Sequence, residues 1–565
     1  MPKAWEKYYS EAARNFDPAQ MKNRTIAQAI NDAVEKYADK PALTTILPTG
    51  AETTISYKEL GAKSDHFAAY LREGLGLQSG DVVALMSPNC IGFCVASLGI
   101  AKAGCISTNV NPLYTASELQ HQLTDSNAKA IVIIDLFGDK LDQVVAKTAV
   151  KHVVTLSIVD FFPPLKKALL GAVLKYARKV IPTLNAAHTK FAAALAQGAN
   201  LARTADVAGY TKDVQPSDTT LYQYTSGTTG RSKGGELSHE SVLINAEQAY
   251  LMTQEKMGDQ GETILIALPL YHITAYVLIF IAGMTTGGHG VLVPSPRPPS
   301  NLQKAFEKYT VTWFTGINTL YAALLAEPWF EKKFFENMRF SGSGGAAQTT
   351  GVAAKWLEKT GVDINQGYGM TEVSGILTLN PHSDNRFGKV GIPVPGAEVR
   401  IVDDAGNDVP SGEPGEVIAR TPSLMKGYLN NPEATADVMK NGWYHSGDIG
   451  VMDEDGFIEI VDRKKDMILV SGFNVSPNEI EDVISKLPGV VQVGVIGIED
   501  EKMGEAPAAF IVRSDDSLTE EAVLSACKAN LTNYKTPRKV TFVDEVPVTL
   551  SGKVLRRELR DKYIG

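Results

Sequence analysis

The chain has 565 residues, of which 44% are hydrophobic and 21% are charged. This length exceeds what one hydrophobic core usually serves, and the composition is that of an ordinary globular protein, so a small binding module, a coiled coil and a mostly disordered chain are excluded. The 55 basic and 64 acidic residues leave a net charge of −9, which argues against a nucleic-acid binder whose affinity depends on neutralising phosphates.

The chain carries few cysteines, and its N-terminus lacks the features of a secretion signal. Four cysteines occur, at positions 90, 94, 105 and 527, and no Cys or His lies around them at the spacing of a zinc site. The opening residues MPKAWEKYYSEAARNF carry charges of both signs and contain no apolar core segment. We therefore expect no disulfide framework, no structural metal and a location in the reducing cytoplasm.

The first 400 residues alternate short β-rich runs with longer helical patterns. The β-rich runs include VVALM at 82–86, KAIVIID at 129–135 and HVVTL at 152–156, and helical patterns at 56–76 and 116–126 lie before and between them. Such alternation is typical of parallel sheets flanked by helices. The predicted fold class is therefore α/β, with mostly parallel sheets in a large N-terminal lobe.

Residues 161–205 contain seven basic residues and no acidic one. Within them LKKALLGAVLKYARKVI, at 165–181, has helical periodicity. On a helix, one half would carry Leu165, Leu169, Leu170, Val173, Leu174, Tyr176, Val180 and Ile181. The other half would carry Lys167, Lys175, Arg178 and Lys179. Two interpretations stay open: a helix at about 161–182 that lies in the interface of an anionic membrane, or a helix whose apolar half packs on the protein's own core.

Residues 224–239, YTSGTTGRSKGGELSH, form a loop dense in glycine and hydroxyl residues. Backbone amides and hydroxyls of such a loop can converge on an anion, and Lys233 adds a positive charge. We therefore predict a phosphate-binding loop and prefer this interpretation to that of a flexible surface loop. The P-loop of nucleoside triphosphatases is excluded, because Gly227 and Gly230 are too close for its GxxxxGK pattern. Ser232 stands in a formal GxSxG pattern, which leaves a serine hydrolase as an alternative, although a hydroxyl-rich loop precedes it where a hydrophobic strand should.

An uncharged stretch runs from Thr263 to His289 and is long enough to span a bilayer. Pro269 and the polar pair Tyr271 and His272 divide it into a short β-rich piece and a later helical piece. We therefore expect a buried strand, a turn and a buried helix in place of a membrane span.

Residues 342–347, GSGGAA, match the GxGxxA dinucleotide fingerprint and precede a helical pattern. A fingerprint should follow a strong apolar strand, and the preceding MRF is expected to be a poor one. Two interpretations stay open: a dinucleotide oxidoreductase that uses the glycines at 342–345, or a backbone turn that lets a base or ribose approach closely.

Residues 366–372, QGYGMTE, combine an aromatic ring between glycines with a hydroxyl and an acid. Tyr368 can stack on a purine, Thr371 can bond a phosphoryl oxygen and Glu372 can hold a magnesium ion. A structural turn with an incidental acid is the alternative interpretation.

Short strands and turn pairs at about 386–462 predict an antiparallel β-rich subdomain. Within it, Asp448 can grip ribose hydroxyls, and Arg463 can reach ribose or phosphate. Ordinary turn chemistry and a surface ion pair form the alternative.

The charged run RKKD follows, and then a compact α+β pattern continues to the C-terminus. We therefore predict a boundary near Lys465, with domains at 1–464 and 465–565. Near the end, PVTLSGK places Lys553 after a glycine turn, where its ammonium is suited to stabilising a developing phosphoryl or carboxylate charge.

These motifs, in this order, resemble those of the adenylate-forming superfamily of acyl-CoA synthetases, adenylation domains and luciferases over nearly the whole chain. YTSGTTGRSKG resembles its phosphate loop, QGYGMTE its adenine and magnesium motif, NGWYHSGDIG with DRKKD its ribose and hinge motifs, and LSGKVLRRELR its terminal lysine motif. NGWYHSGDIG together with VDRKKDMILVSGFNVSPNEIE is close to the signature of bacterial long-chain fatty acyl-CoA ligases. Two positions depart from the family pattern, Ser232 in place of proline and Ser446 in place of threonine, and the first leaves the loop less preorganised.

The resemblance implies a long-chain fatty acid–CoA ligase that forms AMP and uses ATP, Mg²⁺ and coenzyme A. A ligase for a medium-chain, branched or aromatic acid is the alternative within the superfamily. The residues implied to hold the triphosphate are Thr225, Ser226, Gly227, Thr228, Thr229, Gly230 and Lys233. Those implied to form the adenine pocket are Gly344, Gly345, Ala346 and Tyr368. The ribose would be held by Asp448 and Arg463.

The resemblance also assigns catalytic roles. Lys553 would bridge the carboxylate and the phosphate, Thr371 would contact the α-phosphate and Glu372 would bind the magnesium ion. His272 would lie beside the acyl carboxylate.

Finally, the resemblance implies a mobile C-terminal domain. Lys465 would be its hinge, and the CoA tunnel would then receive Gly472, Phe473 and Asn474. A fatty substrate dissolved in the inner leaflet favours peripheral attachment of residues 161–182 to that face of the membrane. The expected partners are fatty acid, ATP and CoA, with no nucleic acid and with a homodimer left open.

Overall fold

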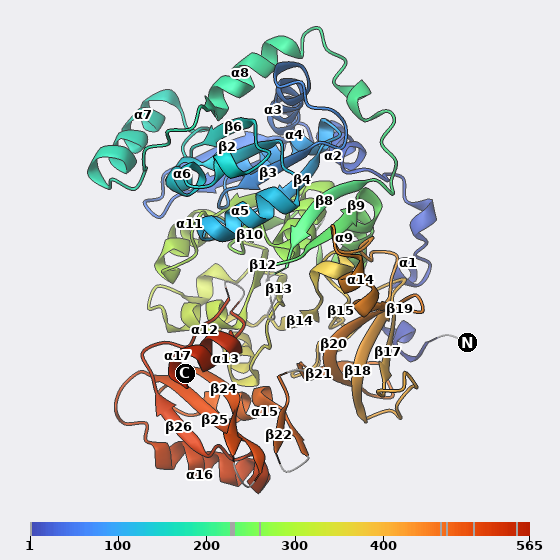
Figure 1. Ribbon diagram of the computed structural model, residues 1–565, viewed down its shortest axis with the longest axis vertical. Coiled ribbons are helices and arrows are strands. Elements are labelled where there is room, and N and C mark those ends of the chain that lie inside the picture. Colours follow the sequence, from blue (N-terminus) through green and yellow to red (C-terminus); the bar gives the residue numbers. More distant parts are fainter. Residues whose placement is uncertain are drawn as a thin grey trace.

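The computed structural model describes residues 3–225, 232–258, 261–463, 466–470, 473–500, 503–549 and 552–564. The strands of these residues form four sheets. Figure 1 shows the two large sheets in the upper and middle parts of the molecule, with the β-rich part (orange) and the C-terminal part (red) below them. The predicted α/β class is confirmed.

The first large sheet has seven strands in the order β7-β6-β5-β3-β4-β8-β9. Its neighbours pair in parallel except β8 and β9, which are antiparallel. β3 and β5 are buried along their whole length, as expected for parallel strands covered on both faces. The strands are β3 (Val82–Met86), β4 (Ile106–Asn109), β5 (Ala130–Ile134), β6 (His152–Leu156), β7 (Thr189–Lys190), β8 (Thr219–Tyr224) and β9 (Gly234–Ser238).

The second large sheet has nine strands in the order β16-β15-β14-β13-β12-β10-β11-β1-β2. Its central pairs, from β14 to β1, are parallel, and its outer pairs are antiparallel. The strands are β1 (Pro41–Ile46), β2 (Glu52–Ser56), β10 (Thr263–Ile266), β11 (His289–Leu292), β12 (Trp313–Gly316), β13 (Phe340–Ser343), β14 (Ile364–Tyr368), β15 (Thr378–Leu379) and β16 (Ile392–Pro393).

The two smaller sheets follow in the chain. The predicted β-rich part is an antiparallel sheet of five strands: β17 (Glu398–Val402), β18 (Pro414–Arg420), β19 (Met439–Lys440), β20 (Trp443–Met452) and β21 (Ile458–Arg463). The C-terminal sheet contains β22 (Ile468–Val470), β23 (Phe473–Val475), β24 (Val490–Asp500), β25 (Gly504–Arg513) and β26 (Lys539–Phe542).

Several helices begin where the sequence supplies a capping residue. Thr25, Ser56 and Thr115 each accept a backbone N–H from the residue three positions on, whose side chain returns the bond. The helices of the N-terminal part are α1 (Glu11–Arg14), α2 (Ile26–Lys36), α3 (Tyr57–Ala69), α4 (Ile91–Lys102), α5 (Ala116–Asp125), α6 (Gly138–Asp142), α7 (Pro164–Ala172), α8 (Phe191–Leu201) and α9 (His239–Thr253). The later helices are α10 (Ala282–Thr285), α11 (Gln303–Lys308), α12 (Asn318–Ala326), α13 (Thr350–Thr360), α14 (Pro432–Val438), α15 (Pro477–Ser485), α16 (Glu520–Asn530) and α17 (Arg556–Tyr563).

One hydrophobic core joins the two large sheets. Leu85 of β3 and Leu265 of β10 belong to the same cluster of buried side chains. α4 contributes to it and is buried along its whole length, which explains why its sequence, IGFCVASLGIAK, is apolar on every face. This shared core fixes the position of one large sheet relative to the other, and with it the positions of their strand ends.

The uncharged stretch at 263–289 folds as the sequence predicts. It forms β10, a turn, a π-helical segment at Thr274–Ile281 that continues into α10, and then β11. Among the described residues, we find no helix with both the length and the apolar composition needed to cross a membrane.

The expectation that MRF is a poor strand holds for Met338 and Arg339, which lie outside any strand, but the chain forms an unexpected strand, β13, from Phe340 onward. β13 is a central strand that pairs in parallel with both β12 and β14. The polar side chain of Ser341 has a hydrogen-bond partner inside the core, because the Trp356 indole N–H donates to its Oγ at 3.2 Å. The strand is also packed by an aromatic contact, in which Trp313 stacks on Phe340 with ring centroids 4.1 Å apart. Tertiary packing overrides the weak local pattern here.

The predicted amphipathic helix is present, but it is shorter than expected. α7 continues as a π-helical segment over Val173–Ala177, whereas Val180 and Ile181 lie beyond it. Lys179 has a φ of +53°, and the proline at 182 disfavours helical backbone at the residue before it. Both features end the helix. No residue of either segment is buried, but Leu170 and Leu174 are half-buried, so the protein's own core covers the apolar half only in part.

Candidate active site

The predicted phosphate loop connects the antiparallel strands β8 and β9. The backbone N–H of Thr225 donates to the carbonyl of Lys233 at 2.9 Å, which closes the base of the loop. The predicted ligands Ser226, Gly227, Thr228, Thr229 and Gly230 lie outside the described residues. Lys233 extends its ammonium over the ring of Tyr428, 5.1 Å from the ring centroid.

Ser232 does not stand in a nucleophile elbow. It stands two residues before the start of β9, in the connection between two antiparallel strands, whereas an elbow is a sharp turn from a strand into a helix. The Nε2–H of His121 donates to the Ser232 carbonyl at 2.9 Å, so the residue anchors the base of the loop. The serine hydrolase alternative therefore lacks its structural context.

The QGYGMTE motif forms the end of β14 and the tight turn after it. A Cβ added at Gly369 would lie 1.8 Å from the carbonyl oxygen of Gly375, so the turn admits only glycine there. Thr371 faces the neighbouring strand, where its Cγ2 would lie 3.4 Å from a Cβ added at Gly235 in β9. Glu372 is 8% exposed, and its Oε1 accepts a hydrogen bond from the Tyr428 hydroxyl at 2.5 Å. The turn is therefore pressed against the base of the predicted phosphate loop.

Asp448 meets this motif from the β-rich sheet. The hydroxyl of Tyr368 donates to Asp448 Oδ2 at 2.6 Å, and Asp448 is 6% exposed. Its backbone N–H donates to Ser446 Oγ, so the serine at this position still acts as an acceptor. Arg463 is the register partner of Asp448 across β20 and β21, which places the two predicted ribose-binding residues side by side on the backbone.

The loop after β13 lies beside the same motif. A Cβ added at Gly344 would lie 3.4 Å from the carbonyl oxygen of Gly367 in β14, and Gly345 has a φ of +81°. Ala346 follows in this partly exposed loop. The structure therefore brings the predicted adenine residues to the end of β14, where Tyr368 stands.

A polar network that sequence reasoning missed fixes this loop. Asn318 Oδ1 accepts hydrogen bonds from the Gln348 side chain at 2.8 Å and from the backbone N–H of Thr349 at 3.1 Å. The side-chain oxygen Oε1 of Gln348 in turn accepts a hydrogen bond from the Ser343 hydroxyl at 2.8 Å. The network ties the start of α12 to both ends of the loop after β13.

His272 lies on a loop held by two buried amides. Asn89 donates to two backbone carbonyls and accepts one backbone N–H within residues 266–270, and Gln223 donates to the Tyr271 carbonyl at 3.0 Å. Gln223 stands two residues before the predicted ligand Thr225, so this loop and the phosphate loop share one anchor. Burial lowers the pKa of the His272 imidazole, which favours its neutral form.

Lys553 lies in a hairpin turn that touches the large lobe. The turn is closed by Thr549, whose backbone N–H donates to the Lys553 carbonyl at 2.8 Å. Gly552 has a φ of +78°, and a Cβ added there would lie 3.0 Å from Thr319 Oγ1 and 3.2 Å from Ile317 Cδ1. The terminal lysine therefore stands next to the start of α12, where Asn318 anchors the loop after β13.

The predicted hinge is flanked by a buried ion cluster. Arg556, which is 9% exposed, donates to Glu481 Oε1 at 3.0 Å and lies 3.6 Å from a carboxylate oxygen of Asp466 and 3.9 Å from one of Asp462. Burial raises the pKa of Glu481 to about 7. The cluster spans the predicted hinge Lys465, which itself lies outside the described residues.

The predicted CoA-tunnel residues Phe473 and Asn474 lie in β23, paired with Val470 and Leu469 of β22. Gly472 lies outside the described residues. The hairpin context of the prediction is thus present.

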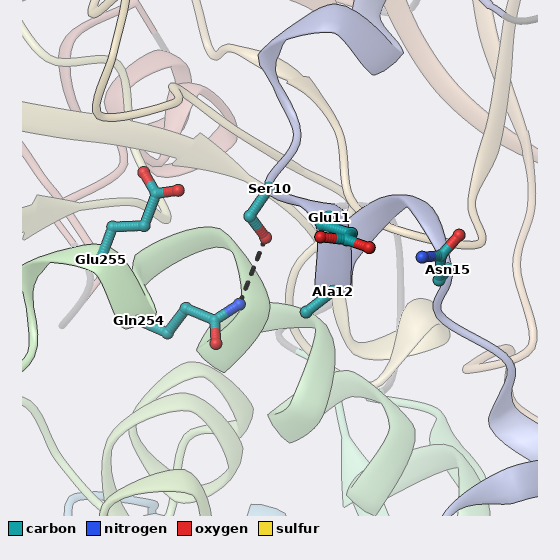
Figure 2. Close-up of a pocket in the computed structure, with 6 residues that line it drawn as sticks. All are labelled: Ser10, Glu11, Ala12, Asn15, Gln254 and Glu255. Atoms are coloured by element: carbon teal, nitrogen blue, oxygen red, sulfur yellow. Dashed lines mark hydrogen bonds between the residues drawn. The ribbon is translucent and has the colours of Figure 1, made fainter.

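A separate surface depression of about 670 Å³ lies between α1 and the end of α9. Figure 2 shows the residues that line it, with the Gln254 side-chain N–H donating to Ser10 Oγ at 3.3 Å. None of the predicted site residues lines this depression. It therefore takes no part in the site.

Comparisons with known proteins agree with this arrangement. The chain matches the family models AMP-binding enzyme, over residues 30–429, and AMP-binding enzyme C-terminal domain, over residues 479–553. It is similar to a long-chain-fatty-acid–CoA ligase of Escherichia coli O6:H1, with 42% identity over 569 residues that cover 100% of this chain and 99% of that protein.

Solved structures are similar over almost the whole chain. A crystal structure of an anthranilate CoA ligase in complex with anthranoyl-AMP superposes with a TM-score of 0.84 at 25% identity and covers 97% of this chain and 98% of that chain. The structure of ATP-bound MatB from Rhodopseudomonas palustris has a TM-score of 0.80 at 30% identity and covers 95% and 99%. Similarity therefore extends through both parts of the molecule.

Proposed function

The chain belongs to the AMP-binding enzyme family, and we propose that it is a long-chain fatty acid–CoA ligase. The observation that carries the substrate class is its full-length similarity, at 42% identity, to a long-chain-fatty-acid–CoA ligase. The convergence of Lys233, Glu372, Tyr368 and Asp448 supports a nucleotide site in the large lobe. A dinucleotide oxidoreductase that uses residues 342–345 has no support in this family membership.

The proposed reaction has two steps. A carboxylate is a poor electrophile, so one of its oxygens first attacks the α-phosphorus of ATP; an acyl–phosphate bond forms and pyrophosphate leaves. The thiol sulfur of CoA then attacks the acyl carbon, a thioester forms, AMP leaves and the thiol proton passes to solvent. Because both steps move negative charge, positioning and preorganised positive groups carry the catalysis.

The proposed nucleotide contacts follow the described geometry. Thr225 and Lys233, at the two ends of the loop, would hold the phosphates together with residues 226–230. Tyr368 would lie against the adenine beside the loop at residues 344–346, and Asp448, fixed by the Tyr368 hydroxyl, would accept from the ribose hydroxyls.

Glu372 fits a magnesium ion that is shared with ATP. Among the described residues there is no group of three metal-ligating side chains, and Mg²⁺ is commonly held by one or two carboxylates together with substrate phosphates. A single buried carboxylate oriented by a phenol suits that arrangement. When bound, the ion supplies positive charge to the phosphates, while Thr371 beside β9 would contact the α-phosphate.

His272 and Lys553 would act on the fatty carboxylate. A neutral imidazole can donate one N–H to a carboxylate oxygen without pairing with it as an ion, which suits a group that must remain nucleophilic. Lys553, held by its turn against α12, would balance charge between the carboxylate and the α-phosphate.

We place the movable unit at residues 465–565, with the hinge at Lys465. Rotation of this unit would withdraw Lys553 after the first step and present Gly472, Phe473 and Asn474 to the CoA tunnel. Lys465→Pro, which fixes φ at the hinge, should therefore trap one orientation and impair overall turnover.

The exposed helix α7 supports peripheral attachment to the inner face of a membrane. Leu165, Leu169 and Tyr176 are 87%, 66% and 70% exposed, and lysine and arginine side chains share the segment. Apolar side chains would enter the headgroup region while basic residues attract anionic lipids. The homodimer stays a prediction without an observation that favours it.

A panel of fatty acids of increasing chain length tests the substrate class. Pyrophosphate release and CoA consumption should both depend on ATP and on the acid, and kcat/KM should rise toward long chains. A maximum with medium-chain, branched or aromatic acids would contradict the proposal. No pyrophosphate with any acid would contradict the reaction itself.

A further inference from the structure

Tyr428 joins two charged side chains that belong to different motifs. Its hydroxyl donates to Glu372 Oε1 at 2.5 Å, and the ammonium of Lys233 lies over its ring, 5.1 Å from the centroid. Tyr428 and Glu372 are each 8% exposed, so the hydrogen bond between them is shielded from bulk water. We propose that Tyr428 is a positioning residue for adenylation: its hydroxyl orients the Glu372 carboxylate toward magnesium, and its ring holds the Lys233 ammonium toward the phosphates.

The backbone around Tyr428 is fixed on both sides. Neighbouring residues bond to β9, because the Lys426 N–H donates to the Glu236 carbonyl at 2.8 Å and the Leu429 N–H donates to the Gly234 carbonyl at 2.7 Å. The N–H of Tyr428 itself donates to Thr435 Oγ1 at 2.8 Å. The segment thus lies along β9 like an added strand, and the ring has a defined place.

The same segment is tied to the acidic turn. The backbone N–H of Met425 donates to the carbonyl oxygen of Glu372 at 2.8 Å. One segment therefore holds Glu372 at two points: Met425 bonds to its main chain, and Tyr428, three residues later, bonds to its side chain. A carboxylate that is fixed in this way loses less freedom when it binds a cation.

The two contacts of Tyr428 can be separated by substitution. Tyr428→Phe removes the hydroxyl donor and keeps the ring under Lys233, whereas Tyr428→Leu removes both. This inference rests on the proposed function, because it assumes that Glu372 binds magnesium together with ATP. It goes beyond that function by assigning a role to a residue outside the proposed set of ligands.

The experiment measures ATP binding without fatty acid, so that no turnover occurs. ATP is titrated calorimetrically into each variant, once with Mg²⁺ and once with a chelator. For Tyr428→Phe we expect the gain in ATP affinity on adding Mg²⁺ to fall about 10-fold, with affinity in the chelator unchanged. For Tyr428→Leu we expect the same loss, and ATP affinity in the chelator about threefold weaker, because the cation–π contact is also removed.

Tyr210→Phe is the matched control. The Tyr210 hydroxyl donates to Glu73 Oε1 at 2.8 Å, so the substitution also removes a phenol from a glutamate, but outside the proposed site. Its ATP and Mg²⁺ binding should equal that of the unmodified protein.

Glu372→Gln separates failure of this inference from failure of the proposed function. If Glu372→Gln keeps the full Mg²⁺-dependent gain, the proposed metal role of Glu372 is wrong. If it abolishes that gain while Tyr428→Phe leaves it intact, the positioning role of Tyr428 alone is overturned. The double variant with Tyr428→Phe and Glu372→Gln should bind ATP in the presence of Mg²⁺ no more weakly than Glu372→Gln alone, because the Tyr428 hydroxyl acts through Glu372. Additive losses of affinity would also overturn the inference. Thermal unfolding of each variant verifies that binding is compared between folded proteins.

Discussion

Two apolar helical segments of this molecule have opposite environments. The segment at Thr274–Ile281, which continues into α10, buries Tyr276, Phe280 and Ile281 in the core between the large sheets. α7 and its π-helical extension to Ala177 bury no residue, and α7 (teal) stands at the edge of the molecule in Figure 1. Both segments are rich in leucine, isoleucine and valine.

The difference lies in how charge is distributed, because the apolar content is similar. From Thr263 to His289 there is no charged side chain, so every face of the helix can be covered by protein. The segment at 165–181 carries basic residues along one half, which need water or anions and therefore keep the helix at the surface. A helix that is apolar all round is typical of a core, whereas a basic amphipathic helix is typical of the surface of the molecule.

A buried charge gives the largest expected contrast. Ile281 is fully buried, so Ile281→Asp should destabilise the protein by about 4 kcal/mol or more, or prevent folding. Leu165 is 87% exposed, so Leu165→Asp should change the unfolding free energy by less than about 0.5 kcal/mol. Chemical denaturation of the two variants measures the contrast. Equal losses would mean that Leu165 packs on the protein after all.

Charge reversal tests the surface helix as a membrane contact. The protein should sediment with anionic liposomes at low salt, and less so as salt rises. Replacing Lys175, Arg178 and Lys179 with glutamate should weaken binding by about 1 kcal/mol or more per residue, while pyrophosphate release with a water-soluble short acid stays unchanged. Neutral liposomes serve as the control. A protein that stays in the supernatant at low salt, or a triple variant that sediments equally well, would contradict the attachment.

A hydroxyl pair tests the packing of the buried segment. Tyr276 and Ser97 of α4 share a hydrogen bond of 2.9 Å between their oxygens, and both side chains are almost fully buried. Tyr276→Phe leaves the Ser97 hydroxyl without this partner, which should cost about 1 to 2 kcal/mol of unfolding free energy. Adding Ser97→Ala should recover part of the loss, because both polar groups are then gone. If Ser97→Ala instead lowers the unfolding free energy of the Tyr276→Phe variant by roughly another 1 to 2 kcal/mol, the two hydroxyls are not coupled.

The same contrast shows what the sequence could predict. Segments with a regular local pattern were predicted correctly. The runs VVALM, AIVII and HVVTL form β3, β5 and β6, and the periodic basic segment forms the helix α7. β13 was not predicted, because FSGS has little local strand preference and its place depends on Trp313 and Trp356, which approach from other parts of the chain. Long-range packing of this kind leaves no periodic signal.

The candidate site was predictable to the extent that it consists of short motifs. Tyr368 and Asp448 stand in separate motifs, and the structure joins them by one hydrogen bond. Tyr428 and Asn89 were missed, because each acts through contacts with a segment far away in the sequence. A buried polar residue within an apolar neighbourhood is the signal that could have drawn attention to such positions.

The smallest expected effect concerns the base of the surface helix. Lys167 of α7 forms an ion pair with Asp160 at 2.8 Å. Besides burial, the negative charge of Asp160 contributes to a raised pKa of the nearby Asp135. Burial raises the pKa of Asp135 to about 6, while the Ser157 hydroxyl partly opposes the shift.

A raised carboxyl pKa means that the folded protein binds the proton more tightly than the unfolded chain does. The resulting stabilisation is complete below about pH 4 and is lost as pH rises through about 6, so at pH 7.5 the ionised carboxylate is a penalty. Asp135→Asn should therefore raise the unfolding free energy at pH 7.5 by about 1 kcal/mol and flatten its pH dependence between about 4 and 6.5. Denaturation curves across this range measure both effects, and an unchanged slope would show that Asp135 ionises normally.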